Sequence, residues 1–244
     1  VLAHISQAKN QLISWEEYQY LNHNYFTEKV AELFKAYQRE LAKNQAMDFD
    51  DLIMKTVQLF KENPQILDYY QERYRYISVD EYQDTNHAQY TFVKMLAEKY
   101  RNICVIGDPD QSIYSWRGAN MQNILDFEKD YPEALIIKLE QNYRSTSIIL
   151  DAAHAIIEKN RNRKEKRLWT EREGGENIRI WTARDERDEA FLIAQEIGKQ
   201  LRSYESPEYK DFAVLYRTNA QSRVLEEAFM RHGKKARKFS VLRK

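Results

Sequence analysis

Three carboxylates stand close together after a short strand-like stretch in the first half of the chain. The stretch Tyr76–Val79 is rich in residues that favour strands, and Asp80, Glu81 and Asp84 follow it within five residues. In an open α/β sheet, ligands bind at the carboxyl ends of the strands. Because Mg²⁺ keeps most of its waters, one or two carboxylates and phosphate oxygens suffice to hold it. Asp80 is therefore a candidate metal ligand, and Glu81 a second ligand or the group that orients or deprotonates an attacking water.

A polar loop follows the next predicted strand. Gly107-Asp108-Pro109-Asp110-Gln111 comes directly after Ile103–Ile106, so Gln111 can lie beside Asp80 and Glu81. An amide accepts from a water and donates to a phosphate oxygen, which suits a sensor of a terminal phosphate. A simpler interpretation stays open, in which Gln111 stabilises a turn and the acidic pair occupies a solvated turn or a helix start.

Aromatic and cationic residues occur together at two further places in the sequence. Tyr114, Trp116 and Arg117 could stack on the bases of a single strand, and each stacked base is worth about 1–3 kcal/mol. Packing in a core is the alternative for Trp116. Tyr143-Arg144 follows the third predicted strand, where a planar cation could meet charge developing on a phosphoryl group or form a structural salt bridge.

The stretches that hold these residues resemble, in order and spacing, the motifs of superfamily 1 DNA helicases of the UvrD/Rep/PcrA type. The resemblance extends from about Ile5 to about Gly233. Four long matches in register are far more specific than a single short motif. The matching stretches are Val79-Asp80-Glu81-Tyr82-Gln83-Asp84-Thr85-Asn86, residues 107–119, residues 139–145 and residues 211–223.

The resemblance implies ATP and Mg²⁺ as cofactors and single-stranded DNA at a duplex junction as the partner. It implies that Asp80 and Glu81 bind the metal and that Glu81 is also catalytic. Gln111 would be catalytic, sensing the γ-phosphate and linking the nucleotide to the DNA groove. The remaining roles it implies are nucleotide contact for Tyr143, an arginine finger on the nucleotide for Arg144, and DNA binding for Tyr114, Trp116, Arg117 and Asn219.

The elements that must position these residues alternate between strands and helices. Such alternation predicts a parallel sheet with right-handed crossovers. With the resemblance, it predicts an α/β fold: a partial RecA-like P-loop NTPase sheet, a helical insertion remnant and part of a second RecA-like lobe. Cys104 is predicted to lie in the core. The predicted strands are 76–79, 103–106, 135–139, 178–182 and 212–216, and the helices between and after them are 87–99, 122–130, 146–160, 186–203 and 220–232.

We predict four segments. Residues 1–46 form the helical insertion remnant of the first motor domain, which we expect to be poorly packed although Val30, Leu33 and Phe34 have helical spacing. Residues 47–144 form the first RecA-like domain, in which acids at Asp48 and its neighbours cap a helix. Residues 145–233 begin the second RecA-like domain, and a basic run at 158–172 is a solvated connector or a phosphate contact. Residues 234–244 form a basic, loosely ordered tail.

Composition limits the remaining classes. The chain has 38 basic and 38 acidic residues, so a nucleic acid would be bound by local patches. A single cysteine excludes an internal disulfide framework. The sequence has no apolar run of about 20 residues and no signal peptide, so we predict a cytoplasmic protein without membrane contact. Since the chain starts at Val1 inside helical sequence, we expect a piece of a longer protein.

Two parts of the family pattern are missing from the 244 residues. No Gly-x-x-x-x-Gly-Lys-Ser/Thr loop occurs, and the family's C-terminal motifs are absent as well. We therefore predict a fragment of an ATP-dependent 3′–5′ DNA helicase or translocase of DNA repair or replication, which is inactive as an ATPase by itself. The alternative is a non-catalytic truncated relative that binds single-stranded DNA or a partner protein. A third possibility is the helicase portion of a recombination helicase-nuclease. The sequence does not specify partner proteins or the oligomeric state.

Overall fold

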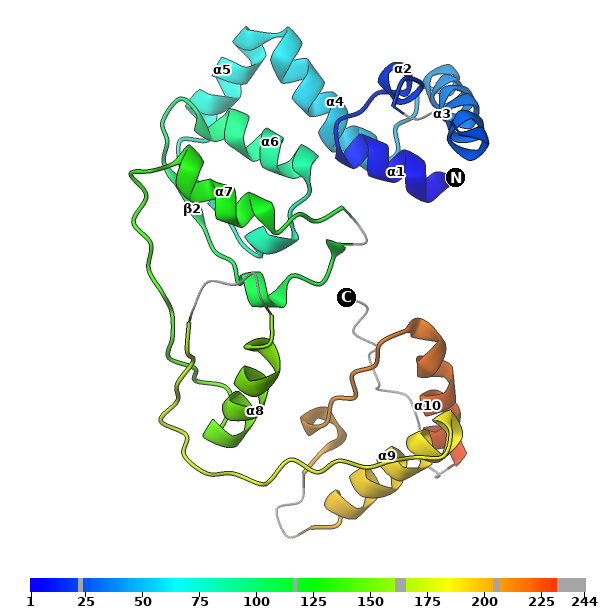
Figure 1. Cartoon of the computed structure of the whole chain (residues 1–244), viewed down its shortest axis with the longest axis vertical. Helices are drawn as coiled ribbons and strands as arrows, with labels where there is room; N and C mark the ends of the chain where they lie inside the picture. The colour runs from blue at the N-terminus through cyan, green and yellow to red at the C-terminus, as the bar shows by residue number, and fades with distance from the viewer. Residues whose placement is uncertain (22–23, 116–117, 161–165, 204–206, 232–244) are drawn as a thin grey trace. The chain divides into compact units, whose positions relative to one another are not determined.

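The computed structural model of the protein describes residues 1–21, 24–115, 118–160, 166–203 and 207–231. The chain divides into two compact units, Val1–Gly175 and Glu176–Lys244 (Figure 1). No helix in the described ranges is both long enough and apolar enough to cross a membrane. The predicted basic tail, residues 234–244, lies outside the described residues.

The first helices of the chain share a small core. They are α1 (Leu2–Asn10), α2 (Trp15–Tyr18) and α3 (Tyr25–Lys43). Ile5 and Ala8 of α1 pack against Val30 and Phe34 of α3, and all four are buried. Leu33, predicted on the same stripe, is 49% exposed. The expectation that this segment is poorly packed was wrong, because α1 supplies the apolar surface that covers the α3 stripe.

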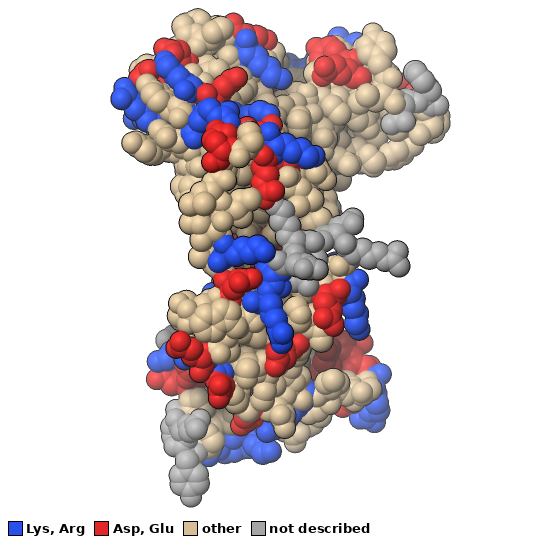
Figure 2. Space-filling view, turned by 60° about the vertical axis from the view of Figure 1, so that its left-hand side comes forward, with Lys and Arg blue, Asp and Glu red and all other residues tan. Residues whose placement is uncertain are grey.

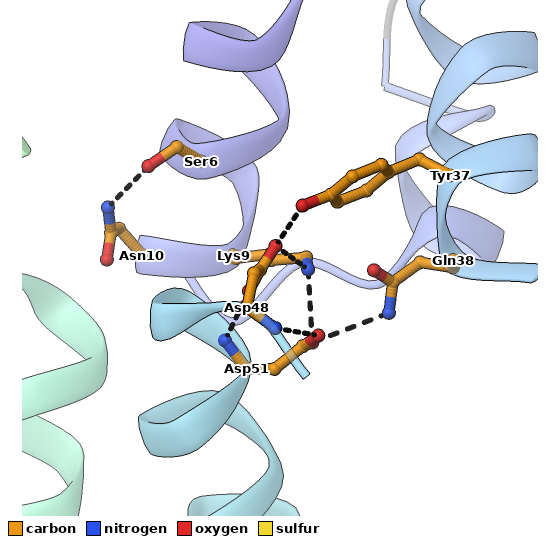
Figure 3. Close-up of polar contacts among 7 residues, drawn as sticks. All are labelled: Ser6, Lys9, Asn10, Tyr37, Gln38, Asp48 and Asp51. Carbon is orange, nitrogen blue, oxygen red and sulfur yellow. Dashed lines mark hydrogen bonds and ion pairs between the residues drawn. The ribbon is translucent and has the colours of Figure 1, made fainter. Parts of the chain in front are cut away.

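A buried lysine joins these helices to the next one, α4 (Phe49–Glu62) (Figure 3). The Lys9 side chain is 0% exposed, and its Nζ lies 2.6 Å from Asp48 Oδ2 and 3.1 Å from Asp51 Oδ1. Tyr37 of α3 donates its hydroxyl to Asp48 at 3.0 Å. Asp48 also accepts the backbone N–H of Asp51, which confirms its predicted role as a helix cap. We call Lys9, Tyr37, Asp48 and Asp51 the Lys9 network.

Two further helices pack around α4. α4 ends just before Asn63-Pro64, and α5 (Pro64–Arg73) begins at once, because proline is well tolerated in the first turn of a helix. α6 (His87–Ala97) packs against α4 and α1, as Figure 1 shows. Asn86 caps α6 by accepting the backbone N–H of Gln89. These contacts place the N-terminal helices directly beside the segment that follows the first strand.

The sheet in the described residues has two parallel strands, β1 (Ile77–Val79) and β2 (Ile103–Val105), with Ile77 opposite Ile103. Their inward side chains pack against Tyr82 and against Phe127 of α7 (Gln122–Asp130). Side chains alternate along a strand, so Ser78 and Cys104 point to the other face, which is exposed. Cys104 is therefore exposed rather than part of the core, because only one face of the sheet is covered.

The other three predicted strands, at 135–139, 178–182 and 212–216, are not strands. Leu135 is 84% exposed, Ile180 89% and Leu215 90%. A strand requires a neighbour that pairs with its backbone, and in the described part of the chain these stretches have no such ladder. An isolated bridge between Gln141 and Trp169 follows the first of these stretches. The structure is mixed α/β with a small parallel sheet, and the RecA-like lobes stay a prediction.

The remaining predicted helices are present. α8 (Ser147–Ile157) belongs to the first unit, and α9 (Glu186–Gln200) and α10 (Asn219–Arg231) belong to the second. Ala194 and Ile197 of α9 pack against Phe229 of α10. A short turn of 3₁₀ helix, η4 (Tyr209–Asp211), precedes Phe212, which packs on the same cluster. The units divide after Gly175 and the predicted domains near residue 145, so the predicted domain assignment stays a prediction.

Basic and acidic side chains are interspersed on the face that Figure 2 draws. Many charged side chains of the described residues pair locally, as Lys94 does with Asp130 at 2.6 Å and Arg101 with Glu133 at 2.6 Å. Exposed pairs of this kind contribute little to stability. They fit the balanced formal charge of the sequence, 38 basic against 38 acidic residues.

Candidate active site

Two of the predicted site segments meet at one edge of the sheet. β1 leads into Asp80-Glu81, and β2 leads into the loop that contains the 3₁₀ turn η2 (Pro109–Gln111). Since the strands are parallel neighbours in register, both segments leave the sheet at the same edge. Backbone pairing continues beyond the strands, with Ile106 N donating to Val79 O at 2.8 Å and Tyr82 N to Ile106 O at 2.9 Å.

Gln83 joins the two segments. It lies in the 3₁₀ turn η1 (Tyr82–Asp84) and is 0% exposed. Its Nε2 donates to Glu81 Oε2 at 2.6 Å, and its Oε1 accepts the backbone N–H of Asp108 at 2.9 Å. A buried amide must satisfy both its donor and its acceptor, and here each partner comes from a different loop. Sequence reasoning missed Gln83, because only its burial distinguishes it from the other amides of the chain.

The close approach of the two loops depends on Gly107. A Cβ atom at this position would lie 2.8 Å from Gln83 Oε1 and 2.9 Å from Ile124 Cδ1. Real Cβ atoms do not come so near other heavy atoms, so only glycine fits without a shift of Gln83 or Ile124. The glycine at the end of β2 thus permits the Gln83 bridge.

Glu81 holds an unusual backbone conformation. Its φ of 50° and ψ of 42° are left-handed, a region that costs a non-glycine residue of order 1 kcal/mol or more. The bond from Gln83 fixes its side chain, and Asp80 Oδ1 accepts its backbone N–H at 2.9 Å. Asp80 and Glu81 are both exposed. The local structure therefore presents two adjacent carboxylates to solvent from a strained, well-held turn.

Gln111 is attached to the same edge through Asp108. Its Nε2 donates to Asp108 Oδ2 at 2.9 Å, and Asp108 Oδ1 accepts the backbone N–H of Asp110 at 2.9 Å. Lys166 forms an ion pair with Asp108 and lies 3.4 Å from Asp110. Burial alone would raise the pKa of Asp108, but hydrogen bonds from Lys166 and Gln111 outweigh it and hold that pKa below its ordinary value. Gln111 is exposed and is linked to Glu81 only indirectly, through Asp108 and Gln83.

Tyr143 and Arg144 lie on a separate turn of the first unit, and both are exposed. Tyr143 donates its hydroxyl to Gln141 Oε1 at 2.7 Å, and Asn142 Oδ1 accepts the Arg144 backbone N–H at 2.9 Å. Among the described residues, no hydrogen bond or ion pair joins Arg144 to the acidic pair or to Gln111. The structure brings Asp80, Glu81 and Gln111 to one edge and does not attach Arg144 to them.

The predicted DNA contacts are described only in part. Tyr114 is half-buried and lines a pocket of about 600 Å³ together with residues of α1 and α4 and the turn before α6, among them Asn10 and Asn86. Asn219 is exposed at the start of α10 in the second unit. Trp116 and Arg117 lie outside the described residues.

The two exposed carboxylates suit Mg²⁺ better than a metal held by protein ligands alone. In the ranges that the structure describes, no three His, Cys, Asp or Glu side chains converge on one point. Mg²⁺ does not need such a set, because it accepts one or two carboxylates and completes its shell with water and phosphate oxygens. Asp80 and Glu81 therefore fit the metal that accompanies a nucleoside triphosphate.

Comparison with known proteins identifies the class. The family model described as the UvrD/REP helicase N-terminal domain matches residues 1–132, and that of the UvrD-like helicase C-terminal domain matches residues 137–241. The chain belongs to the UvrD/Rep helicase family, as its motifs predicted.

Among curated proteins, the chain is similar to the ATP-dependent DNA helicases PcrA of Staphylococcus epidermidis and Staphylococcus aureus. It is 56% identical to each over 227 residues. The aligned part is 93% of this chain but 31% of each relative, so the chain spans about a third of the length of these relatives.

Proposed function

We propose that this chain is the central part of an ATP-driven DNA translocase that, when intact, moves 3′ to 5′ along one strand and unwinds the duplex. The observation that carries the proposal is the sheet edge where Glu81 and the Asp108–Gln111 loop are joined through buried Gln83. Membership in a helicase family supports it, as does the likeness to proteins named ATP-dependent DNA helicase. We also propose that the protein acts in the cytoplasm, in DNA repair or replication.

The residues at the edge have distinct chemical roles in this proposal. Asp80 would hold Mg²⁺, with Glu81 beside it, and the bound metal would neutralise charge on the phosphates. The Glu81 carboxylate, held by Gln83, would accept a hydrogen bond from the attacking water and take its proton. Tyr143 would lie against the adenine, and Arg144 would stabilise charge on the transferred phosphoryl group.

Gln111 would connect the nucleotide with DNA. Its side chain is exposed and held by Asp108, and Tyr114 follows three residues later beside the pocket described above. A phosphate oxygen that took the Gln111 amide away from Asp108 would alter the start of the stretch that leads to Tyr114. The stretch continues to Trp116 and Arg117, which we propose bind single-stranded DNA together with Asn219.

The chain alone provides the first test. Its 244 residues contain no loop that cradles the phosphates, so we expect negligible ATP hydrolysis with or without single-stranded DNA. A DNA-stimulated rate that Glu81→Gln abolishes would show that the chain is a complete ATPase and would overturn this expectation.

The direction of movement is tested with a polypeptide that carries both this chain and a phosphate-binding loop. We expect it to displace the strand of a partial duplex that has a 3′ single-stranded tail and to leave one with a 5′ tail intact. Faster displacement from the 5′ tail would refute the proposed direction while leaving the helicase assignment in place.

A second candidate function is single-stranded DNA binding without catalysis, which the aromatic residues Tyr114 and Trp116 in the sequence after Gln111 favour. Binding of a labelled oligothymidine, followed by fluorescence anisotropy without nucleotide, distinguishes the two. Tight binding by the chain that Trp116→Ala or Tyr114→Ala reduces, with no hydrolysis in any longer polypeptide, would favour the binding function. Each stacked base lost should lower affinity by about 1–3 kcal/mol.

A further inference from the structure

Residues 166–172 contact the loop that carries Gln111 and the segment that carries Tyr143 and Arg144, and we call them the strap. At the start of the strap, Lys166 pairs with Asp108 and lies 3.4 Å from Asp110. The Lys166 side chain is 22% exposed, and those of Asp108 and Asp110 are 24% and 11% exposed. A partly desolvated pair is screened less than a surface pair, so its geometry is better defined.

The end of the strap is bonded to the segment that carries Tyr143 and Arg144. Trp169 N donates to Glu140 O at 2.9 Å, and Asn142 N donates to Trp169 O at 2.7 Å. Arg172 Nη1 donates to Arg144 O at 2.9 Å. Ser147 N, at the start of α8, donates to Arg172 O at 3.1 Å. Four hydrogen bonds thus fix the strap along residues 140–147, and three of them are made between backbone atoms.

Asp108 transmits the position of Lys166 to Gln111. Its Oδ1 pairs with Lys166 and accepts the Asp110 backbone N–H, while its Oδ2 accepts the Gln111 side-chain amide. The carboxylate plane, and with it the direction of the Gln111 bond, is set by the groups on Oδ1. Lys166 is also a cation at an edge that holds four carboxylates, those of Asp80, Glu81, Asp108 and Asp110. Its removal would take one positive charge from this edge and leave Asp108 Oδ1 with the Asp110 backbone N–H alone, so the carboxylate plane would be held less firmly.

We propose that Lys166 is a positioning residue: through Asp108 it fixes the side-chain amide of Gln111, and through the strap it couples that amide to the loop that carries Tyr143 and Arg144. The catalytic meaning of this coupling rests on the function proposed above. The coupling itself is a property of the folded chain and exists without nucleotide. Either can therefore fail without the other.

The test uses nuclear magnetic resonance of the full 244-residue chain without nucleotide. In Lys166→Met, which keeps the length of the side chain but removes its charge, we expect the side-chain amide signals of Gln111 to move. We also expect the hydrogen-bonded amides of Asn142 and Ser147, at the far end of the strap, to exchange with solvent about tenfold faster. Lys166→Arg should restore both readouts, because a guanidinium can still pair with Asp108.

Arg167→Met is the matched control, because Arg167 is the exposed neighbour of Lys166 in the same segment and carries the same charge. It should leave the Gln111 signals and the exchange at Asn142 and Ser147 unchanged. If Lys166→Met leaves the Gln111 side chain unmoved, or if its effects stay within residues 108–112 and 165–167, the proposal is refuted. An equal effect of Arg167→Met would refute it as well.

Should Lys166→Met fail to fold, Arg172→Met removes the one side-chain bond that fixes the strap along residues 140–147, from Arg172 Nη1 to Arg144 O. The Gln111 side-chain signals should then move although Arg172 does not touch that loop, and unmoved signals would contradict the coupling. None of these readouts requires ATP hydrolysis. If the helicase proposal were refuted, the coupling through the strap could therefore still be confirmed. If the coupling were refuted, the helicase proposal would likewise remain.

Discussion

Two lysines of this chain each lie between two aspartates, in regions with opposite characters. Lys9 is fully buried between Asp48 and Asp51, whereas Lys166 is partly exposed between Asp108 and Asp110. The Lys9 network joins α1, α3 and α4, and the side chains of its Lys9 and Asp51 are closed to solvent. The Lys166 cluster adjoins two exposed carboxylates and an exposed amide. The same pairing of charges can stabilise the fold in one region and position the groups of the proposed reaction site in another. The degree of burial decides which of the two roles applies.

The largest effect should come from Lys9→Met. This change leaves the Asp51 side chain, 1% exposed, as an uncompensated charge in the interior, and we expect a loss of about 3–5 kcal/mol in the free energy of unfolding. Urea denaturation followed by circular dichroism measures it. Lys29→Met is the control, since Lys29 pairs with Glu32 at the surface and should change stability little. If the two variants lost equal free energy of unfolding, burial would not explain why one ion pair stabilises the fold more than the other.

Gln83→Leu should have the next largest effect. It keeps the volume of the side chain but removes both the donor to Glu81 and the acceptor of the Asp108 N–H, at a cost of about 1–3 kcal/mol. Gln111→Leu, at the exposed amide of the same edge, should alter unfolding by less than about 0.5 kcal/mol. Thermal unfolding of both variants makes the comparison. A larger loss for Gln111→Leu would mean that the edge is not held together through Gln83.

The pH dependence of stability should distinguish the Lys9 network. Burial would raise the pKa of Asp48, but hydrogen bonds from Lys9 and from the Asp51 backbone outweigh it, so the folded-state pKa is lowered. A lowered folded pKa means that the unfolded chain binds the proton more readily. The stabilisation is therefore present above the ordinary aspartate pKa of about 3.9 and is lost as the pH falls below it toward the folded value.

Asp48→Asn should flatten this part of the stability curve, which unfolding measured at a series of acidic pH values would reveal. Asp151→Asn, at an exposed carboxylate of α8, controls for the general effect of acid. If Asp48→Asn left the curve unchanged, Asp48 would not contribute to the loss of stability in acid.

The smallest effect concerns the strained turn at Glu81. Because φ is 50° there, Glu81→Gly should unfold at higher denaturant than Glu81→Ala, by about 1 kcal/mol in free energy. The two variants lose the same carboxylate, so their difference isolates the backbone. Glu81→Ala equal to or more stable than Glu81→Gly would indicate that the left-handed conformation is not kept in solution.

The sequence was informative where a pattern is local. The strands β1 and β2, each within one residue of its predicted bounds, the bounds of α7 and the cap at Asp48 follow from neighbouring residues, and all are present. Residues 135–139 and 212–216 were predicted as strands because they are apolar, but a strand also depends on a partner elsewhere in the chain. The same limit explains Cys104, whose burial depends on a second layer over its face of the sheet.

The sequence predicted the exposed residues of the candidate site. It did not predict the residues that hold their side chains in place. Asp80, Glu81 and Gln111 follow strands and carry reactive side chains, so their types and places sufficed. Gln83 and Lys166 act through contacts with residues 25 and 58 positions from them, Asp108 in both cases, and a sequence pattern does not encode such contacts. Residues that position a site therefore emerge only from the folded chain.

The most direct test of the central claim is the rate of ATP hydrolysis, stimulated by single-stranded DNA, of a polypeptide that joins this chain to a phosphate-binding loop. If the edge formed by Glu81 and the Gln83-linked loop is the reaction site, Glu81→Gln should lower the rate by about a hundredfold or more while nucleotide still binds. Glu98→Gln, on the same unit but away from the edge, should keep the full rate. A Glu81→Gln variant as fast as the parent would contradict the account.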